Sequence, residues 1–154
     1  MAPNPTPPPF SETQFVDASP SIEPQMAHNN GWIGVDLDMT LATYDHWRGS
    51  DHIGEPVPAM LAHVKKLLEE GEDVRIFTAR VSPQAIIGHG DPTAEGQKDE
   101  LTKVVTAIVM WCVKHVGRPL KITHSKDYSM KWCYDDRAIQ MVPNEGRRAD
   151  GLPL

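Results

Sequence analysis

From residue 31 onward, short continuous apolar runs alternate with longer segments whose apolar residues recur every three or four positions. A run of four or five apolar residues between turn residues is typical of a strand buried on both faces of a parallel sheet. Four segments have this pattern and are predicted as strands, and a fifth is a weaker candidate: 32–35, 73–77, 120–123 and 132–134, then 138–142.

Two segments have the periodicity of amphipathic helices. Over 58–70 the apolar residues recur at helical spacing, and lysines and glutamates occupy the opposite side. Pro58 suits a first helical turn and Gly71 suits a stop. Residues 100–116 carry one broad apolar face and end before Gly117. Strands that alternate with helices predict an α/β fold, here a three-layer, Rossmann-like parallel sheet.

Three segments break this alternation. Residues 41–57 are polar and contain glycine, which predicts a loop or a small hairpin. Residues 81–96 are rich in glycine and proline, which predicts a long loop. Residues 1–30 hold half of the 14 prolines and lack apolar periodicity. We therefore expect a proline-rich, disordered leader over 1–30 and one folded domain over 31–154.

Composition narrows the function classes. A chain of 154 residues has room for one domain with a core of its own. Its net charge of -6 makes bulk electrostatic binding to nucleic acid unexpected. No apolar stretch is long enough to cross a membrane, and the N-terminus does not resemble a secretory signal. We expect a cytoplasmic protein whose two cysteines, Cys112 and Cys133, are free thiols.

The candidate chemistry begins with Asp36 and Asp38, which follow the apolar run 32–35. Ligands of open α/β sheets bind at the carboxyl ends of the strands. Two carboxylates held close together favour a cation between them, and oxygen ligands of this kind suit Mg²⁺. Acidic pairs are also common turn residues, so this pair needs support from the rest of the chain.

That support comes from the other strand ends. Thr78 and Arg80 follow the second predicted strand, Lys126 follows the third, and Asp135 and Asp136 follow the fourth. Because parallel strands end at the same edge of a sheet, we expect these side chains to meet Asp36 and Asp38 there.

Each of these residues also has a plainer interpretation. Thr78 suits a helix N-cap, and Asp136 either supports a metal or caps the following turn. Arg80 and Arg137 either hold substrate or pair with nearby carboxylates. Lys121 and Lys131 are alternatives to Lys126 as the lysine of the site.

In this order the motifs resemble the haloacid dehalogenase-like superfamily, most of whose members are phosphohydrolases. Its first motif is matched by Asp36, Asp38 and Thr40, its second by Thr78, its third by Lys126 and its fourth by Asp135 and Asp136. The likeness covers residues 31–142. Several short runs are similar to small capless phosphatases of this type from bacteria and phages: Leu41-Ala42, Ile53-Gly54-Glu55-Pro56, Ile76-Phe77-Thr78-Ala79-Arg80 and Asp135-Asp136-Arg137-Ala138.

The resemblance implies a Mg²⁺-dependent phosphomonoester hydrolase that forms an aspartyl-phosphate on Asp36. Asp38 would act as the general acid and base, and Thr78 and Lys126 would contact the phosphate. Arg80 is a further candidate for substrate binding. The metal would be held by Asp36, by the backbone carbonyl of Asp38 and by Asp135, with Asp136 in support.

The substrate is left open between a phosphorylated small molecule and a nucleotide or polynucleotide end. Residues 41–57 are too few for a folded cap domain, so we expect an open site. The 81–96 segment either faces the substrate, with Ile86, Ile87 and His89 as candidate contacts, or is a plain surface loop. A non-catalytic adaptor that binds partners through the leader is the rival from another class.

Overall fold

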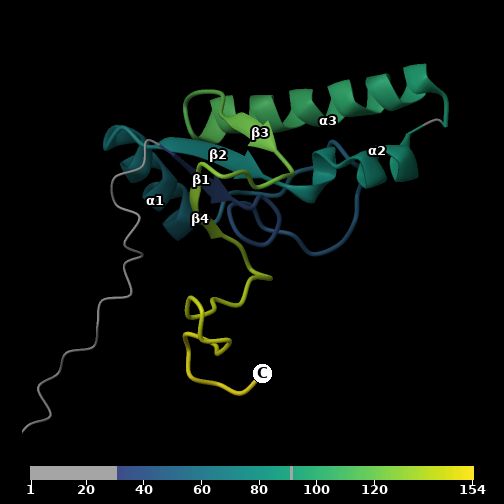
Figure 1. The fold of residues 1–154 in the computed structure, drawn as a ribbon. Helices are drawn as coiled ribbons and strands as arrows, with labels where there is room; N and C mark the ends of the chain where they lie inside the picture. The colour runs from purple at the N-terminus through teal and green to yellow at the C-terminus, as the bar shows by residue number, and fades with distance from the viewer. Residues whose placement is uncertain (1–30, 91) are drawn as a thin grey trace, which may run out of the picture.

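A four-stranded parallel sheet forms the centre of the chain in a computed structural model that describes residues 31–90 and 92–154. The strands are β1 (Trp32–Val35), β2 (Asp73–Phe77), β3 (Lys121–Thr123) and β4 (Met130–Tyr134), in the order β3-β2-β1-β4 (Figure 1). The predicted α/β class and parallel sheet are therefore confirmed. The predicted leader, residues 1–30, lies outside the described residues.

The pairing register brings the strand ends to one edge. Val35 at the end of β1 lies opposite Ile76 of β2 and Tyr134 of β4. The backbone N–H of Asp36 continues this ladder by donating to the Tyr134 carbonyl at 2.9 Å. Consequently the residues that follow β1 and β4 leave the sheet side by side.

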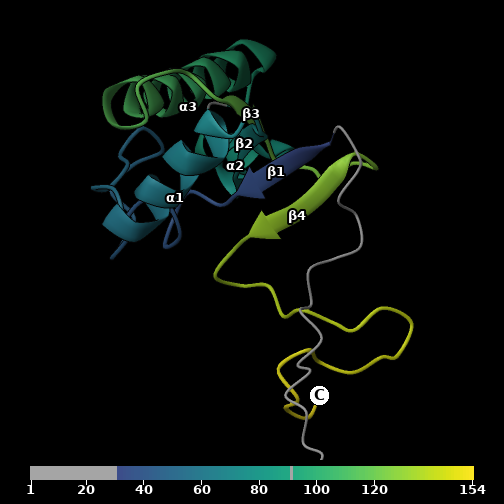
Figure 2. The same cartoon turned by 90° about the vertical axis from the view of Figure 1, so that its left-hand side faces the viewer.

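Two helices cover one face of the sheet. They are α1 (Pro58–Glu69) and α3 (Ala94–His115), and Figure 2 shows both on the same side of β1 and β4. Their buried residues, among them Val64 and Ile108, share one apolar cluster with Ile33, Val35 and Ile76. A helix on each face would require crossovers in opposite directions. Here the two connections that contain these helices, β1 to β2 and β2 to β3, step in the same direction across the sheet. Because such crossovers are right-handed, both helices lie on one face. The described residues form two layers, and the predicted third is not among them.

The opposite face is crossed by residues 124–129, which run from the carboxyl end of β3 to the amino end of β4 without a helix. Asp127 in this segment accepts a hydrogen bond from the Trp32 indole Nε1–H at 2.8 Å. The Arg75 guanidinium lies 4.7 Å from the centroid of the Trp32 ring. These contacts cover Trp32, which is fully buried although it lies outside the main apolar cluster.

The prediction of a long loop over 81–96 is wrong. A short 3₁₀ helix, η1 (Ala79–Val81), leads into α2 (Pro83–His89), and α3 begins at Ala94. The Ser82 hydroxyl caps α2 by accepting from the N–H of Ala85, and Thr93 caps α3 by accepting from the N–H of Gly96. Pro83 sits in the first turn of α2, where its missing N–H costs nothing. The residues that suggested a loop therefore start helices.

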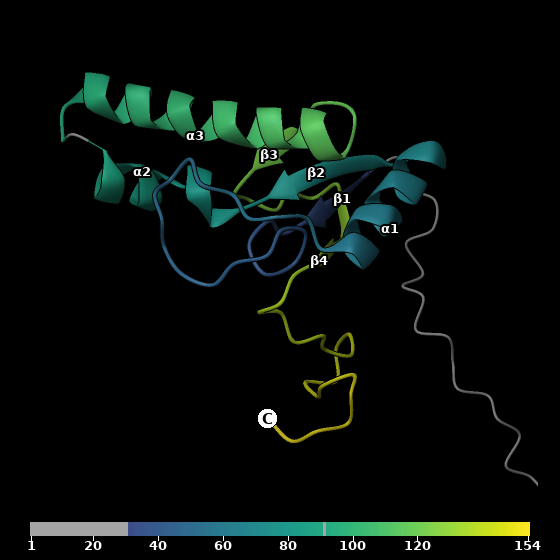
Figure 3. The same cartoon turned by 180° about the vertical axis from the view of Figure 1, so that it is seen from behind.

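The predicted fifth strand over 138–142 is also wrong. Within that range only Met141 makes an isolated bridge, to Arg148. Figures 1 and 3 show residues 135–154 running away from the sheet after β4. By contrast, the prediction for 41–57 is confirmed, because an isolated bridge between Ala42 and Pro56 closes this segment as a small loop. Among the described helices, none combines the length and apolar character that a membrane span requires.

Candidate active site

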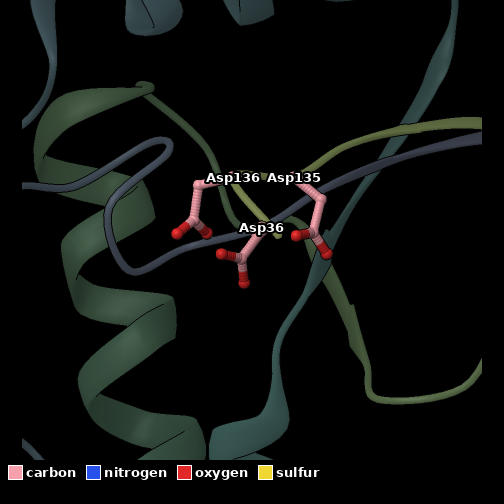
Figure 4. Close-up of side chains that lie close together, drawn as sticks. All are labelled: Asp36, Asp135 and Asp136. Atoms are coloured by element: carbon pink, nitrogen blue, oxygen red, sulfur yellow. The ribbon is translucent and has the colours of Figure 1, made fainter. Parts of the chain in front are cut away.

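Three carboxylates converge at the carboxyl edge of the sheet. Asp36 follows β1, and Asp135 and Asp136 follow the neighbouring β4. One carboxylate oxygen of each lies within 4.8 Å of the others (Figure 4). The convergence follows from the ladder between Asp36 and Tyr134, which aligns the two strand ends. Three of the four residues predicted as metal ligands therefore lie together.

The electrostatics of this triad concentrate negative charge. The pKa of Asp36 is raised to about 7, first by partial burial and then by the charges of Asp135, Asp136 and Asp38, although a hydrogen bond from the Leu37 backbone opposes the shift. Carboxylate oxygens crowded in this way suit a hard divalent cation such as Mg²⁺, which would relieve their repulsion. Exposed acidic groups also gather without an ion, so the magnesium site stays a prediction.

Asp38 lies outside this triad and pairs with Arg80 instead. The Arg80 Nε donates to Asp38 Oδ2 at 2.7 Å, and Nη2 donates to Oδ1 at 2.7 Å. The third guanidinium nitrogen, Nη1, donates to the Ser50 carbonyl at 2.8 Å. Arg80 is only 8% exposed. Arg80 was predicted either to hold substrate or to pair with a nearby carboxylate, and in the structure it pairs with Asp38.

Thr78 caps η1, as its plainer interpretation predicts. Its hydroxyl oxygen accepts a hydrogen bond from the Arg80 backbone N–H at 3.3 Å, and its own N–H donates to the Thr123 carbonyl at 2.9 Å. The residue is 3% exposed. Capping uses only the oxygen as an acceptor, so the hydroxyl proton has no partner among the described residues. The predicted contact with phosphate stays a prediction.

The three candidate lysines are separated by their contacts. Lys131 pairs with Glu72 at 2.6 Å, and Lys121 pairs with Asp73 at 3.0 Å. Both carboxylates lie at the amino end of β2, which is the edge away from Asp36. Lys126 is exposed and makes no ion pair within the described part of the chain. Of the three, Lys126 is the one that no ion pair among the described residues holds at that edge, and its role remains a prediction.

Arg137 follows the triad directly. Its backbone N–H donates to Asp135 Oδ1 at 2.7 Å, and its Nε lies 3.9 Å from Asp136 Oδ2. The first contact orients the Asp135 carboxylate, because it ties the side chain to the turn that follows β4. The Arg137 side chain is otherwise exposed.

Two residues of the 41–57 loop contact Arg80 and were not predicted from the sequence. Ser50 supplies the carbonyl that holds Arg80, and Trp47 places its ring 5.8 Å from the Arg80 guanidinium. The available signal was a large aromatic residue between His46 and Arg48 in an otherwise polar loop. Nothing in the local sequence shows that this loop folds back on Arg80.

Comparisons of the chain with protein-family models, with curated proteins and with solved structures found no match. The fold and the site geometry therefore carry the functional argument. What they define directly is a small α/β chain with a four-stranded parallel sheet and an acidic cluster at its carboxyl edge.

Proposed function

We propose that this chain is a Mg²⁺-dependent phosphomonoester hydrolase that works through an aspartyl-phosphate on Asp36, as small capless haloacid dehalogenase-like phosphatases do. The observation that carries the proposal is the convergence of Asp36, Asp135 and Asp136 within 4.8 Å. It is supported by Asp38 and Arg80, which stand on the segments that continue from β1 and β2 at the same edge.

Asp36 and Asp135 would hold the metal with the backbone carbonyl of Asp38, and Asp136 would support them. When bound, Mg²⁺ would offset the carboxylate charge and that of the substrate phosphate. The raised pKa of Asp36 supports this arrangement, because a nucleophilic carboxylate must be ionised and a nearby cation favours that form.

The chemistry proceeds in two displacements. A carboxylate oxygen of Asp36 attacks phosphorus, the bond to the ester oxygen breaks, and Asp38 gives a proton to the leaving oxygen. Water then attacks the phosphorus of the aspartyl-phosphate, Asp38 takes a proton from it, and inorganic phosphate and free Asp36 result. A carboxylate offers about four lone-pair sites, and the Arg80 fork occupies two. The remaining sites of Asp38 are available for the proton.

Thr78 and Lys126 complete the assignment. The Thr78 hydroxyl donates a hydrogen bond to phosphate, a role compatible with its oxygen accepting from Arg80. The ammonium of Lys126 offsets negative charge on phosphate and on Asp36. Arg80 is a positioning residue, because it holds Asp38 by both carboxylate oxygens.

Hydrolysis of p-nitrophenyl phosphate tests the proposal, measured with Mg²⁺ and with chelator. The expected result is Mg²⁺-dependent turnover that falls on the order of a thousand-fold or more in Asp36→Asn. Asp150→Asn is the matched control, because Asp150 pairs only with Arg148 and neighbouring backbone in the tail. Turnover that survives Asp36→Asn, or that ignores Mg²⁺, contradicts the mechanism.

A further inference from the structure

A small pocket lies beside Arg80, between the 41–57 loop and the segment from η1 to α3. It is a pocket of about 160 Å³, and the residues that matter for its chemistry are Trp47, Arg80, Ile86, His89 and Glu100. Ile86 and His89, two of the candidate substrate contacts predicted from the sequence, both line this pocket. Ile87, the third candidate, does not line it and is exposed.

The pocket has a preorganised aromatic wall. The rings of Trp47 and His89 stack with their centroids 4.5 Å apart and their planes 20° apart. The Arg80 guanidinium lies 5.8 Å from the Trp47 ring centroid, within cation–π range. These neighbours fix the orientation of Trp47, yet 46% of the residue remains exposed. A flat ligand can therefore gain contact with little ordering cost.

The size and lining of the pocket suit a single apolar ring. A cavity of about 150 Å³ accepts a benzene-sized ring, so this pocket holds a single six-membered ring rather than a whole ligand. Most of its lining is apolar. Glu100, which is partly buried, also lines the pocket.

Arg80 joins this pocket to the proposed reaction centre. The same guanidinium lines the pocket and holds Asp38 through two hydrogen bonds. A substrate with its ring in the pocket would therefore extend its remaining part past Arg80 towards Asp38 and Asp36. The ligand chemistry implied is a six-membered aromatic ring joined through a short polar link to a phosphomonoester.

We propose that the pocket binds the pyrimidine base of a nucleoside monophosphate; this assignment rests on the proposed phosphatase activity. The base packs against the outer side of the stacked Trp47–His89 pair, an interaction that nucleobases make with aromatic side chains generally.

Binding of nucleosides tests the pocket without any turnover. Cytidine, uridine and ribose are titrated onto the full chain and followed by NMR chemical shifts. Cytidine is expected to bind more tightly than ribose, and Trp47→Ala is expected to weaken cytidine binding about 10- to 100-fold. Trp47→Phe keeps a ring and should retain most of the affinity. Met110→Ala, which removes an exposed apolar side chain of α3, is the control.

Turnover tests the same assignment on the substrate. The ratio of kcat/KM for cytidine 5′-monophosphate to that for ribose 5-phosphate is expected to fall about 10- to 100-fold in Trp47→Ala.

The outcomes separate the two proposals. Hydrolysis of both phosphomonoesters, with cytidine no better bound than ribose and a ratio indifferent to Trp47→Ala, overturns the base pocket and leaves the phosphatase standing. Cytidine binding through Trp47 without hydrolysis of any phosphomonoester overturns the phosphatase, and with it the assignment of the pocket to a substrate.

Discussion

Arg80 holds Asp38 through two parallel hydrogen bonds of 2.7 Å each, although 42 positions separate the two residues in the chain. The pair connects the turn after β1 to η1, and the third nitrogen of Arg80 connects both to Ser50 in the 41–57 loop. One buried guanidinium thus fixes the relative positions of three segments around the candidate site.

Replacement of Arg80 should destabilise the fold. Arg80→Ala leaves Asp38 and the Ser50 carbonyl without their partner, and we expect a loss of about 1–3 kcal/mol in the free energy of unfolding, because polar groups at a largely buried site are left without hydrogen bonds. Urea unfolding at neutral pH measures the loss. Arg147→Ala, at an exposed ion pair with Glu145, should change stability by less than about 0.5 kcal/mol. Equal effects of the two substitutions would show that the Asp38 pair is not structural.

The acidic triad should make the metal-free protein sensitive to pH. The pKa of Asp36 is about 7 in the folded chain against an ordinary value of 3.8, so the folded state binds the Asp36 proton more tightly than the unfolded state does. Its stabilising contribution is fully present below about pH 4 and is lost as the pH rises through 7.

Asp36→Asn isolates that contribution. The variant should be more stable than the wild type at pH 8 without metal, and it should lose this pH dependence. Thermal unfolding between pH 5 and pH 8 measures the difference. Identical pH profiles for the two proteins would show that Asp36 titrates at its ordinary value.

Met39 should be a site where glycine stabilises the fold. Its φ is 68°, in the left-handed region, and its side chain is 53% exposed, so little packing compensates for the backbone strain. The left-handed conformation costs most residues roughly 1–2 kcal/mol, and glycine loses part of that gain to chain entropy. Met39→Gly should therefore stabilise the chain by about 0.5–1 kcal/mol in urea unfolding.

Asn144 is the control for that prediction. Its φ is 62°, but asparagine tolerates this conformation better than other residues do. Asn144→Gly should change stability by a smaller amount than Met39→Gly. A destabilised Met39→Gly would mean that the Met39 side chain makes a contact that outweighs the strain.

Substitutions of the three candidate lysines should differ in their effect on turnover, according to the edge of the sheet at which each lysine is held. Lys126→Ala is expected to lower turnover of a phosphomonoester on the order of a hundred-fold or more, because it removes positive charge beside the phosphate. Lys121→Ala and Lys131→Ala remove ion pairs with Asp73 and Glu72 at the opposite edge, so turnover should stay within a few-fold of the wild type. A larger loss in Lys131→Ala than in Lys126→Ala would reassign the lysine.

The sequence was most informative where one physical signal dominated. The apolar runs predicted β1 and β2 at their observed bounds, and the helical periodicity predicted α1 to within one residue. The convergence of Asp36 with Asp135 and Asp136 followed from the rule that parallel strands end at one edge.

The remaining features depend on capping and on tertiary contacts. Ser82 and Pro83 start a helix because the serine caps it, yet the same residues are common in loops. The described residues form two layers where three were predicted, because strand order, which apolar patterns do not encode, decides which face a helix covers. The hydrogen bonds of Arg80 with Asp38 and Ser50 join residues that are 42 and 30 positions apart, so no local sequence pattern predicts them.

Asp36 and Asp135 are proposed to share one divalent cation, and isothermal calorimetry of Mg²⁺ titrated into the full chain measures this binding without any turnover. We expect a single site in the wild type and in Asp150→Asn, and its loss in both Asp36→Asn and Asp135→Asn. Absence of binding to the wild type, or binding that survives both substitutions, would contradict it.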